Sequence, residues 1–145
     1  MKGKINREAE RDLNEGLNPS DPPMLWNPNA AGLWSLLFTP TFGSYLLMRN
    51  WRAIGDTRRA IIARRWMIVS AVLIAPSVIF GAIALIYLIV WYFLEQRPQY
   101  SYVMQSWGPE YPRRSWKGVL AIAFGLWTTL WAFVFSGLYL ISRAV

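Results

Sequence analysis

The chain has 145 residues, a length that suits one domain and excludes a multidomain enzyme. Hydrophobic residues make up 54% of it and charged residues only 16%, which is more apolar surface than a small soluble core can cover. It contains no His and no Cys, which excludes imidazole and thiolate catalysis, disulfides and the usual zinc and haem ligands. The net charge of +7 predicts an anionic partner, either nucleic acid or lipid.

Residues 1–25 form a polar N-terminal tail in which Lys, Arg, Glu and Asp alternate with Asn, Gly and Pro. This composition is typical of a solvated segment, or of one that a partner orders. A helix from about Arg7 to Glu15 would be too short to be stable alone. The remainder, residues 26–145, is predicted to be a single helical membrane domain.

Residues 30–48 form a first uncharged run that is interrupted near its middle. Pro40 removes a backbone donor and Gly43 accepts almost any backbone conformation, so the two residues predict a helix break. The two short helices that result, about 30–38 and 43–50, can each reach the middle of a bilayer but cannot cross it. The segment is therefore either a re-entrant hairpin or a kinked third span, and the hairpin is preferred.

Two further uncharged runs predict transmembrane helices at about 66–94 and 117–141. About 20 apolar residues suffice to cross the hydrocarbon of a bilayer, and both runs exceed that length. Trp and Tyr lie near their ends, as an interfacial belt requires, and neither run has the polar face of a helix in a soluble bundle. The expected fold class is an all-α membrane protein, with Pro76 kinking the first of the two spans.

The fifteen Lys and Arg residues fall into four groups: four in the tail, six in 49–65, four in 95–117, and Arg143. If the first run spans the membrane, eight basic residues oppose seven, and the count does not orient the chain. If that run is re-entrant, eleven oppose four, which the positive-inside rule favours. Both arrangements place residues 49–65 in the cytoplasm and residues 95–117 outside, in the periplasm.

The cytoplasmic segment is predicted to be a basic helix, capped by Asp56 and continuous with the first span. Arg58, Arg59, Arg64 and Arg65 point in several directions around that helix rather than along one face. This arrangement argues against a nucleic-acid partner. It favours arginines that bind the headgroups of anionic lipids, with a partner-protein site as the alternative.

Each span carries a face of small residues, and such faces let transmembrane helices approach one another closely. In the second span the face consists of Ala121, Gly125, Thr129, Ala132 and Ser136, and in the first of Ser70, Ser77, Gly81 and Ala84. Packing of the two faces against each other is the first expectation. The alternative is that one of them contacts another subunit.

The external segment 95–117 is rich in Pro and aromatic residues, which disfavours both a continuous helix and disorder. It is expected either to lie on the membrane interface or to dock a partner through Tyr100, Tyr102, Trp107 and Tyr111. Its two acids, Glu95 and Glu110, have no second titratable group at a defined spacing, so they are a weak catalytic candidate.

Three stretches, Asn-Pro-Asn-Ala-Ala at 27–31, Trp-Ser-Leu-Leu-Phe-Thr-Pro-Thr-Phe-Gly at 34–43 and Asn-Trp at 50–51, carry a resemblance. Together they resemble a pattern in small, largely uncharacterised bacterial inner-membrane proteins. In these a Trp-rich, Pro/Gly-broken hydrophobic segment leads into a basic helix and a membrane span. The resemblance covers residues 27–66. It implies a bacterial inner membrane and supplies no active-site residue.

These patterns predict a multi-pass, non-catalytic protein of the bacterial inner membrane, an accessory or structural subunit that packs against other membrane protein subunits. Neither span contains a charge, which argues against a pump or transporter. No cofactor or metal is expected. A protein that interacts with anionic lipids is the first alternative, and a small oligomeric channel or holin-like protein is the second.

Overall fold

The computed structural model describes residues 21–79 and 81–144, and these residues are almost entirely helical. The helices are α2 (Pro28–Ile54), α3 (Thr57–Ile79), α4 (Gly81–Trp91), the π-helix η1 (Tyr92–Gln96), α5 (Arg97–Trp107) and α6 (Lys117–Ala144). The described residues contain no β-strand, only an isolated bridge between Leu25 and Arg113. The predicted all-α class is confirmed. The possible helix in residues 7–15 lies outside the described residues.

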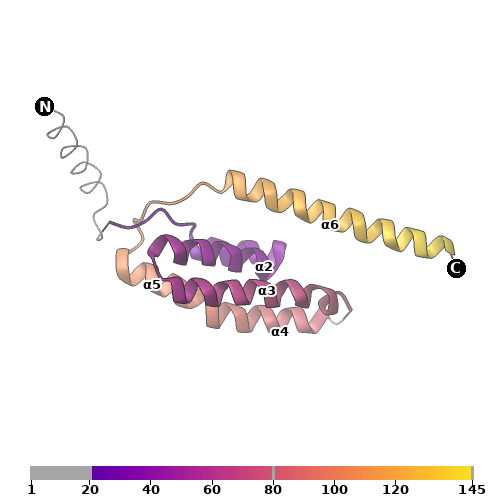
Figure 1. Cartoon of the computed structure of the whole chain (residues 1–145), viewed down its shortest axis with the longest axis horizontal. Coiled ribbons are helices and arrows are strands. Elements are labelled where there is room, and N and C mark those ends of the chain that lie inside the picture. Colours follow the sequence, from indigo (N-terminus) through magenta and orange to yellow (C-terminus); the bar gives the residue numbers. More distant parts are fainter. Residues whose placement is uncertain (1–20, 80, 145) are drawn as a thin grey trace, which may run out of the picture.

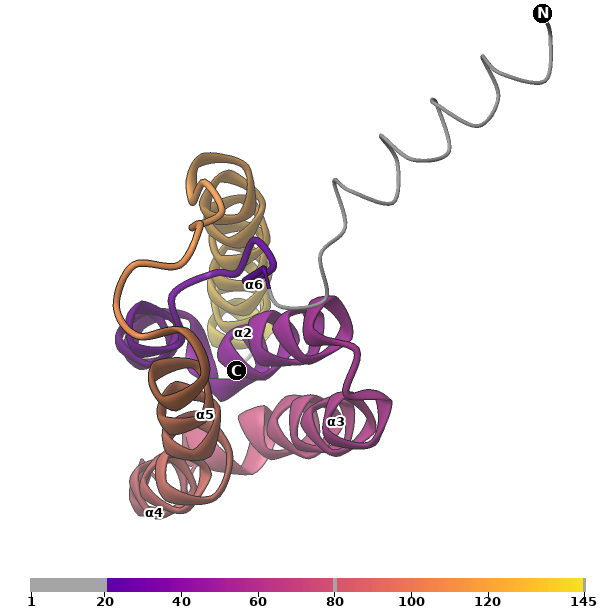
Figure 2. The same cartoon turned by 90° about the vertical axis from the view of Figure 1, so that its left-hand side faces the viewer.

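Helix α2 is broken at Thr39 and folds back on itself. Thr39 has φ 73° and ψ 158°, a non-helical conformation, and Pro40 follows it. The two halves lie side by side, since Ser35 in the first half faces Gly43 in the second. At the open end, the Trp26 N–H donates to Asn50 Oδ1 at 2.9 Å. The predicted break next to Pro40 is present, and its two halves are visible as two separate purple helices in Figure 2.

The bounds and the role of Gly43 differ from the sequence prediction. The second half extends to Ile54, and Gly43 lies inside it with an ordinary helical backbone. A Cβ at Gly43 would meet Ser35 Oγ and would lie 2.7 Å from Cη2 of Trp91. Gly43 is therefore needed because neighbouring helices approach its backbone closely, not because it bends the chain.

Residues 66–94 do not form the single helix, kinked at Pro76, that the sequence predicted. The chain reverses between α3 and α4, and the two helices lie side by side (Figure 1). The Tyr87 hydroxyl donates to the Trp66 carbonyl at 3.0 Å and lies 2.7 Å from Ser70 Oγ. In one straight helix, residues 66 and 87 would be about 32 Å apart, so these bonds require a hairpin. An uninterrupted apolar run hides this turn, because its pattern is the same whether the chain continues or returns.

The basic helix predicted in residues 49–65 is present from Thr57 on, as the first part of α3, whereas residues 49–54 are the end of α2. Its N-terminus is capped by Asp56, whose Oδ1 accepts from the Arg59 N–H at 2.8 Å. The predicted loop at 95–117 is instead helical as far as Trp107, because Pro98 occupies the first turn of α5, where its missing N–H costs nothing. Helices α4, η1 and α5 follow one another directly along the chain, which makes them the long return arm of the hairpin.

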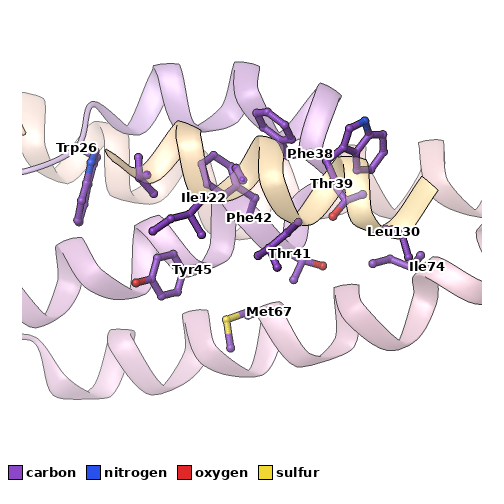
Figure 3. Close-up of a pocket in the computed structure, with 14 residues that line it drawn as sticks. Trp26, Phe38, Thr39, Thr41, Phe42, Tyr45, Met67, Ile74, Ile122 and Leu130 are labelled. Carbon is purple, nitrogen blue, oxygen red and sulfur yellow. The ribbon is translucent and has the colours of Figure 1, made fainter. Parts of the chain in front are cut away.

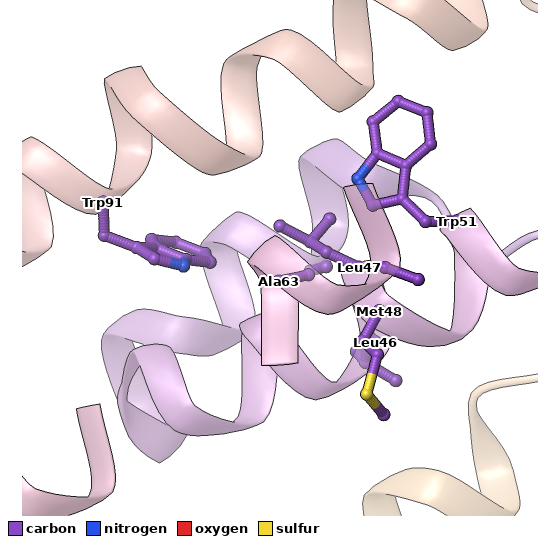
Figure 4. Close-up of a cluster of buried hydrophobic side chains, with 8 residues drawn as sticks. Leu46, Leu47, Met48, Trp51, Ala63 and Trp91 are labelled. Atoms are coloured by element: carbon purple, nitrogen blue, oxygen red, sulfur yellow. The ribbon is translucent and has the colours of Figure 1, made fainter. Parts of the chain in front are cut away.

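The core lies where the second half of α2 packs between α3 and the return arm (Figure 4). Leu46, Leu47 and Trp51 of α2 are buried there together with Ala63 of α3 and Trp91 of α4. The small side chain of Ala63 lets α2 and α3 approach closely. This core fixes the two hairpins as one body.

Helix α6 stands apart from this body and extends beyond it (Figure 1). Its clearest contact with the hairpins is an edge-to-face pair between Phe124 and Phe38, with ring centroids 4.9 Å apart. Two stretches are long and apolar enough to cross a membrane, Thr57–Ser77 in α3 and Lys117–Arg143 in α6. The second agrees with the predicted span at 117–141.

The basic segment 49–65 and the segment 95–117 lie at the same end of the molecule. The Arg59 guanidinium lies 4.7 Å from the ring centre of Trp51 and 5.1 Å from that of Tyr102. The Arg114 Nε donates to the Met24 carbonyl at 2.8 Å. The expectation that these two segments lie on opposite sides of a membrane is therefore wrong. The expectation had residues 66–94 cross the membrane once, whereas the chain reverses between α3 and α4 and returns to the end from which it started.

Candidate functional site

Ten of the described basic residues lie in the last part of α2, the first part of α3 and the segment from α5 to the start of α6. These segments, which contact one another through Arg59 and Arg114, form the basic end of the molecule. The ten residues are Arg49, Arg52, Arg58, Arg59, Arg64, Arg65, Arg97, Arg113, Arg114 and Lys117. All four predicted headgroup ligands, Arg58, Arg59, Arg64 and Arg65, are exposed. Arg59 is held against two aromatic rings and pairs with Asp56 at 3.4 Å. Arg59 therefore stabilises the junction of α2, α3 and α5, and it is less available to a lipid than the other three.

The small-residue face of α6, made of Ala121, Gly125, Thr129, Ala132 and Ser136, is exposed along its whole length. A Cβ at Gly125 would meet nothing within 4 Å, and the Thr129 hydroxyl donates to the Gly125 carbonyl of its own helix at 2.8 Å. On an ideal helix this face points roughly 140° away from the residues of α6 that approach α2. The hairpins contact the bulky side of α6, on which Phe124 and Trp127 lie against Phe38.

The second set of small residues is divided between two helices. Ser70 is buried in α3 and bonded to Tyr87, Ser77 is half-buried, and Gly81 and Ala84 are exposed on α4. The expectation that the two small-residue faces pack against each other is therefore wrong. The turn between α3 and α4 breaks up one face, and α6 presents its other side to the hairpins.

The predicted docking aromatics lie in two different settings. Tyr102 packs between Trp51 and Trp107, with ring centroids 5.2 and 6.0 Å away, and Tyr111 is buried beside Leu25. Burial raises the pKa of the Tyr111 hydroxyl, and neighbouring Arg113 opposes that rise. Tyr100 is 39% exposed. Most of this set contributes to the packing of the basic end, and Tyr100 is its exposed member.

A buried network of side-chain amides joins the two hairpins, and the sequence analysis did not find it. Asn50 Nδ2 donates to the Trp26 carbonyl at 2.7 Å and to Gln99 Oε1 at 3.0 Å. Gln99 Nε2 donates in turn to the Leu47 carbonyl at 2.9 Å. The signal that was available is the spacing of Trp91, Glu95 and Gln99, which recur every four residues on one helical face. The prolines of residues 95–117 conceal this signal, because they predict a loop there.

Glu95 belongs to this buried face and is only 5% exposed. Its Oε1 has no hydrogen-bond partner among the described residues. Burial raises the pKa of this carboxyl to about 7, although the positive charge of Arg59 opposes the shift. Glu95 sits in the π-helix η1, and such irregular turns are frequent at functional sites.

An apolar groove of about 560 Å³ lies between α6 and the two hairpins (Figure 3). One wall is the bulky side of α6 from Val119 to Leu130, and the other is the α2 hairpin around Phe38 and Phe42. Met67 and Ile74 of α3 complete the lining. Trp26 lies at the end of the groove where the basic residues gather, and Ile74 and Leu130 lie at the opposite end (Figure 3).

Among the described residues, no three Asp or Glu side chains gather closely enough to hold a metal ion. Comparisons with protein-family models, with curated proteins and with solved structures find no match to this chain. The features of this chain that bear on its function are the small-residue face of α6, the basic end and the apolar groove.

Proposed function

We propose that this chain is a non-catalytic subunit of a larger protein complex in a bacterial inner membrane, and that the small-residue face of α6 is its contact with the other subunits. The observation that carries the proposal is the exposure of that face. Small residues favour close helix–helix approach, whereas contact with lipid alone makes no such demand on a helix. The hairpins leave the face open, so its partner is another chain.

The proposed arrangement in the membrane is two hairpins that enter from the cytoplasmic side and one complete span, α6. Thr57–Ser77 of α3 is long enough to cross a membrane only with its four arginines included, and the uncharged part of α3, from Trp66 to Ile79, is about 20 Å long. Each half of the α2 hairpin is of similar length or shorter. These lengths are less than the roughly 30 Å of bilayer hydrocarbon, whereas α6 at about 42 Å exceeds it.

The charges support the same orientation. Ten of the eleven basic residues in the described part of the chain belong to the basic end, and the eleventh, Arg143, lies near the C-terminal end of α6. By the positive-inside rule, so strong a bias places the basic end in the cytoplasm and the C-terminal end of α6 in the periplasm. This arrangement revises the expected periplasmic position of residues 95–117 and keeps the expected cytoplasmic position of residues 49–65.

The subunit proposal is tested by placing a bulky residue on the small-residue face. In native electrophoresis of membranes solubilised in mild detergent, the wild-type chain should migrate in a complex much larger than a monomer. Gly125→Leu should release it from that complex, because the side chain would hold the partner helix away. Gly137→Leu is the matched control, since a Cβ there also meets nothing within 4 Å and the residue lies about 120° around the helix from Gly125.

A wild-type chain that migrates as a free monomer would sink the proposal, as would equal effects of the two variants. A complex that contains only copies of this chain would replace the accessory subunit with a homo-oligomer. Identification of the co-migrating chains by mass spectrometry separates these results.

A further inference from the structure

We infer that the groove between α6 and the hairpins binds one acyl chain of an anionic phospholipid, with the phosphate of that lipid against Arg114 and Lys117. The inference goes beyond the subunit role, because it concerns the opposite side of α6 and requires no other protein. It also assigns the lipid to a particular site, instead of to the ring of arginines around α3.

The groove has the shape and chemistry of a site for a single hydrocarbon chain. Its walls are almost wholly apolar and run along α6 from Val119 to Leu130. Eleven helical rises make this stretch about 17 Å long, close to the roughly 15 Å that one leaflet contributes to the hydrocarbon of a bilayer. An acyl chain that starts at the headgroup level would therefore end near the middle of the membrane, where Ile74 and Leu130 lie.

The charges lie at the end of the groove where a headgroup would sit. The Arg114 guanidinium rests 4.8 Å from the ring centre of Trp26, the residue that lines this end. Lys117 is exposed and lies two residues before Val119, at the start of α6. The only ion pair within the described part of the chain is that of Arg59 with Asp56, so no described carboxylate neutralises either residue.

Two contacts fix Arg114 and Trp26 in this position before any ligand binds. The Arg114 Nε donates to the Met24 carbonyl, and the Trp26 Nε1 donates to the Ser115 carbonyl at 3.4 Å. The terminal guanidinium nitrogens of Arg114 form no hydrogen bond among the described residues, and they are the donors that a phosphate accepts best. A side chain held in place in this way loses little entropy on binding.

The test is native mass spectrometry of the full chain in mild detergent, titrated separately with dioleoyl phosphatidylglycerol and dioleoyl phosphatidylcholine. We expect one molecule of phosphatidylglycerol to be retained at least fivefold more than phosphatidylcholine. Lys117→Gln, and more strongly Arg114→Gln with Lys117→Gln, should remove this preference. Arg58→Gln with Arg64→Gln removes the same charge from exposed arginines of α3 and should change retention less than twofold.

The groove itself is tested by a matched pair of alanines on α6. Ala123 lines the groove and is 8% exposed, whereas Ala121 lies on the open face. Ala123→Trp should fill the groove and abolish retention of phosphatidylglycerol, and Ala121→Trp should leave retention unchanged. Circular dichroism shows whether the Ala123→Trp variant folds. If it does not, Ala123→Leu is the milder variant that replaces it.

Equal retention of the two lipids, equal effects of the two alanine variants, or a loss with the α3 arginine variant as large as that with Lys117→Gln would each overturn the inference. Dimers that Ala123→Trp abolishes would assign the groove to a second copy of the chain instead. None of these results changes the migration of the Gly125→Leu variant. The proposal of a lipid site and the proposal of a subunit contact can therefore be refuted independently of each other.

Discussion

Glu95 illustrates how a single side chain acquires an unusual property from its surroundings. It follows an apolar run in the sequence and looks like the first residue of a solvated loop. The α3–α4 turn instead carries it back against α2, where it is buried without a full set of hydrogen bonds. Because burial penalises the charged form, its pKa rises from about 4.5 to about 7.

This shift predicts that the free energy of unfolding falls as pH rises from about 4.5 to about 7, since the folded state binds the extra proton in that window. Above pH 7 the penalty is fully present. Glu95→Gln removes the charge and keeps the shape, so we expect it to stabilise the protein by on the order of 2–3 kcal/mol at pH 8. At pH 4.5 the variant and the wild type should be equally stable. Thermal unfolding in detergent at the two pH values measures this difference, and a gain independent of pH would contradict the assignment.

The requirement for glycine at position 43 also comes from the residues that surround it in the fold. Replacement by Ala should destabilise the fold by about 1–3 kcal/mol, because the new methyl group would overlap Ser35 and Trp91 inside the core. Gly137→Ala, where the added Cβ meets nothing within 4 Å, should be neutral or slightly stabilising. Denaturation of both variants in the same detergent gives the comparison. A Gly43→Ala variant as stable as the wild type would mean that the two halves of α2 are not in contact.

The α3–α4 hairpin is the element that the sequence did not predict. An apolar run long enough to span a bilayer predicts a span, because length and hydropathy are the only signals that such a run offers. Polar groups within the run favour the hairpin. The Tyr87 hydroxyl forms hydrogen bonds with the Ser70 hydroxyl and with the Trp66 carbonyl of the facing helix. In hydrocarbon, an unpaired hydroxyl is costly, so this pairing favours the folded-back form.

The hairpin is tested directly with cysteine pairs, which is simple because the chain has no cysteine of its own. Ser70→Cys with Tyr87→Cys should be joined by a short bifunctional maleimide, since the two residues face each other across the hairpin. In a straight helix they would be about 26 Å apart and would not react together. Ser70→Cys with Phe93→Cys is the control, because Phe93 points outward. Intact mass gives the answer, and failure of the first pair to link would restore the single span.

In the whole molecule, the start of α3 lies at one end of the hairpins, and the end where α3 meets α4 lies at the other (Figure 1). The molecule has most of its described basic residues in the segments around the first of these ends. This polarity makes it a candidate for insertion from one side of a membrane, with α6 alone reaching the other side. The arrangement expected from the sequence differs because it has residues 66–94 cross the membrane once, and each reversal of the chain changes the side on which every later segment lies.

Single cysteines reveal the arrangement in intact cells. Arg58→Cys and Glu110→Cys should both be protected from a membrane-impermeant maleimide, whereas Ser142→Cys should be labelled from the periplasm. Lysed cells, in which all three should react, provide the control for accessibility. Labelling of Glu110→Cys in intact cells together with protection of Arg58→Cys would contradict the one-sided insertion and would restore the topology expected from the sequence.

The sequence by itself determined the helical class, the break near Pro40, the basic start of α3 and the long apolar helix at the C-terminus. Each of these depends on local chemistry: a missing backbone donor, an N-cap, a run of apolar side chains. Only the tertiary structure decided the turn between α3 and α4, the burial of Glu95 and the side of α6 that faces the hairpins. These features depend on which distant residues meet, such as Tyr87 with Trp66 or Asn50 with Gln99, and a single apolar run carries no record of such pairings.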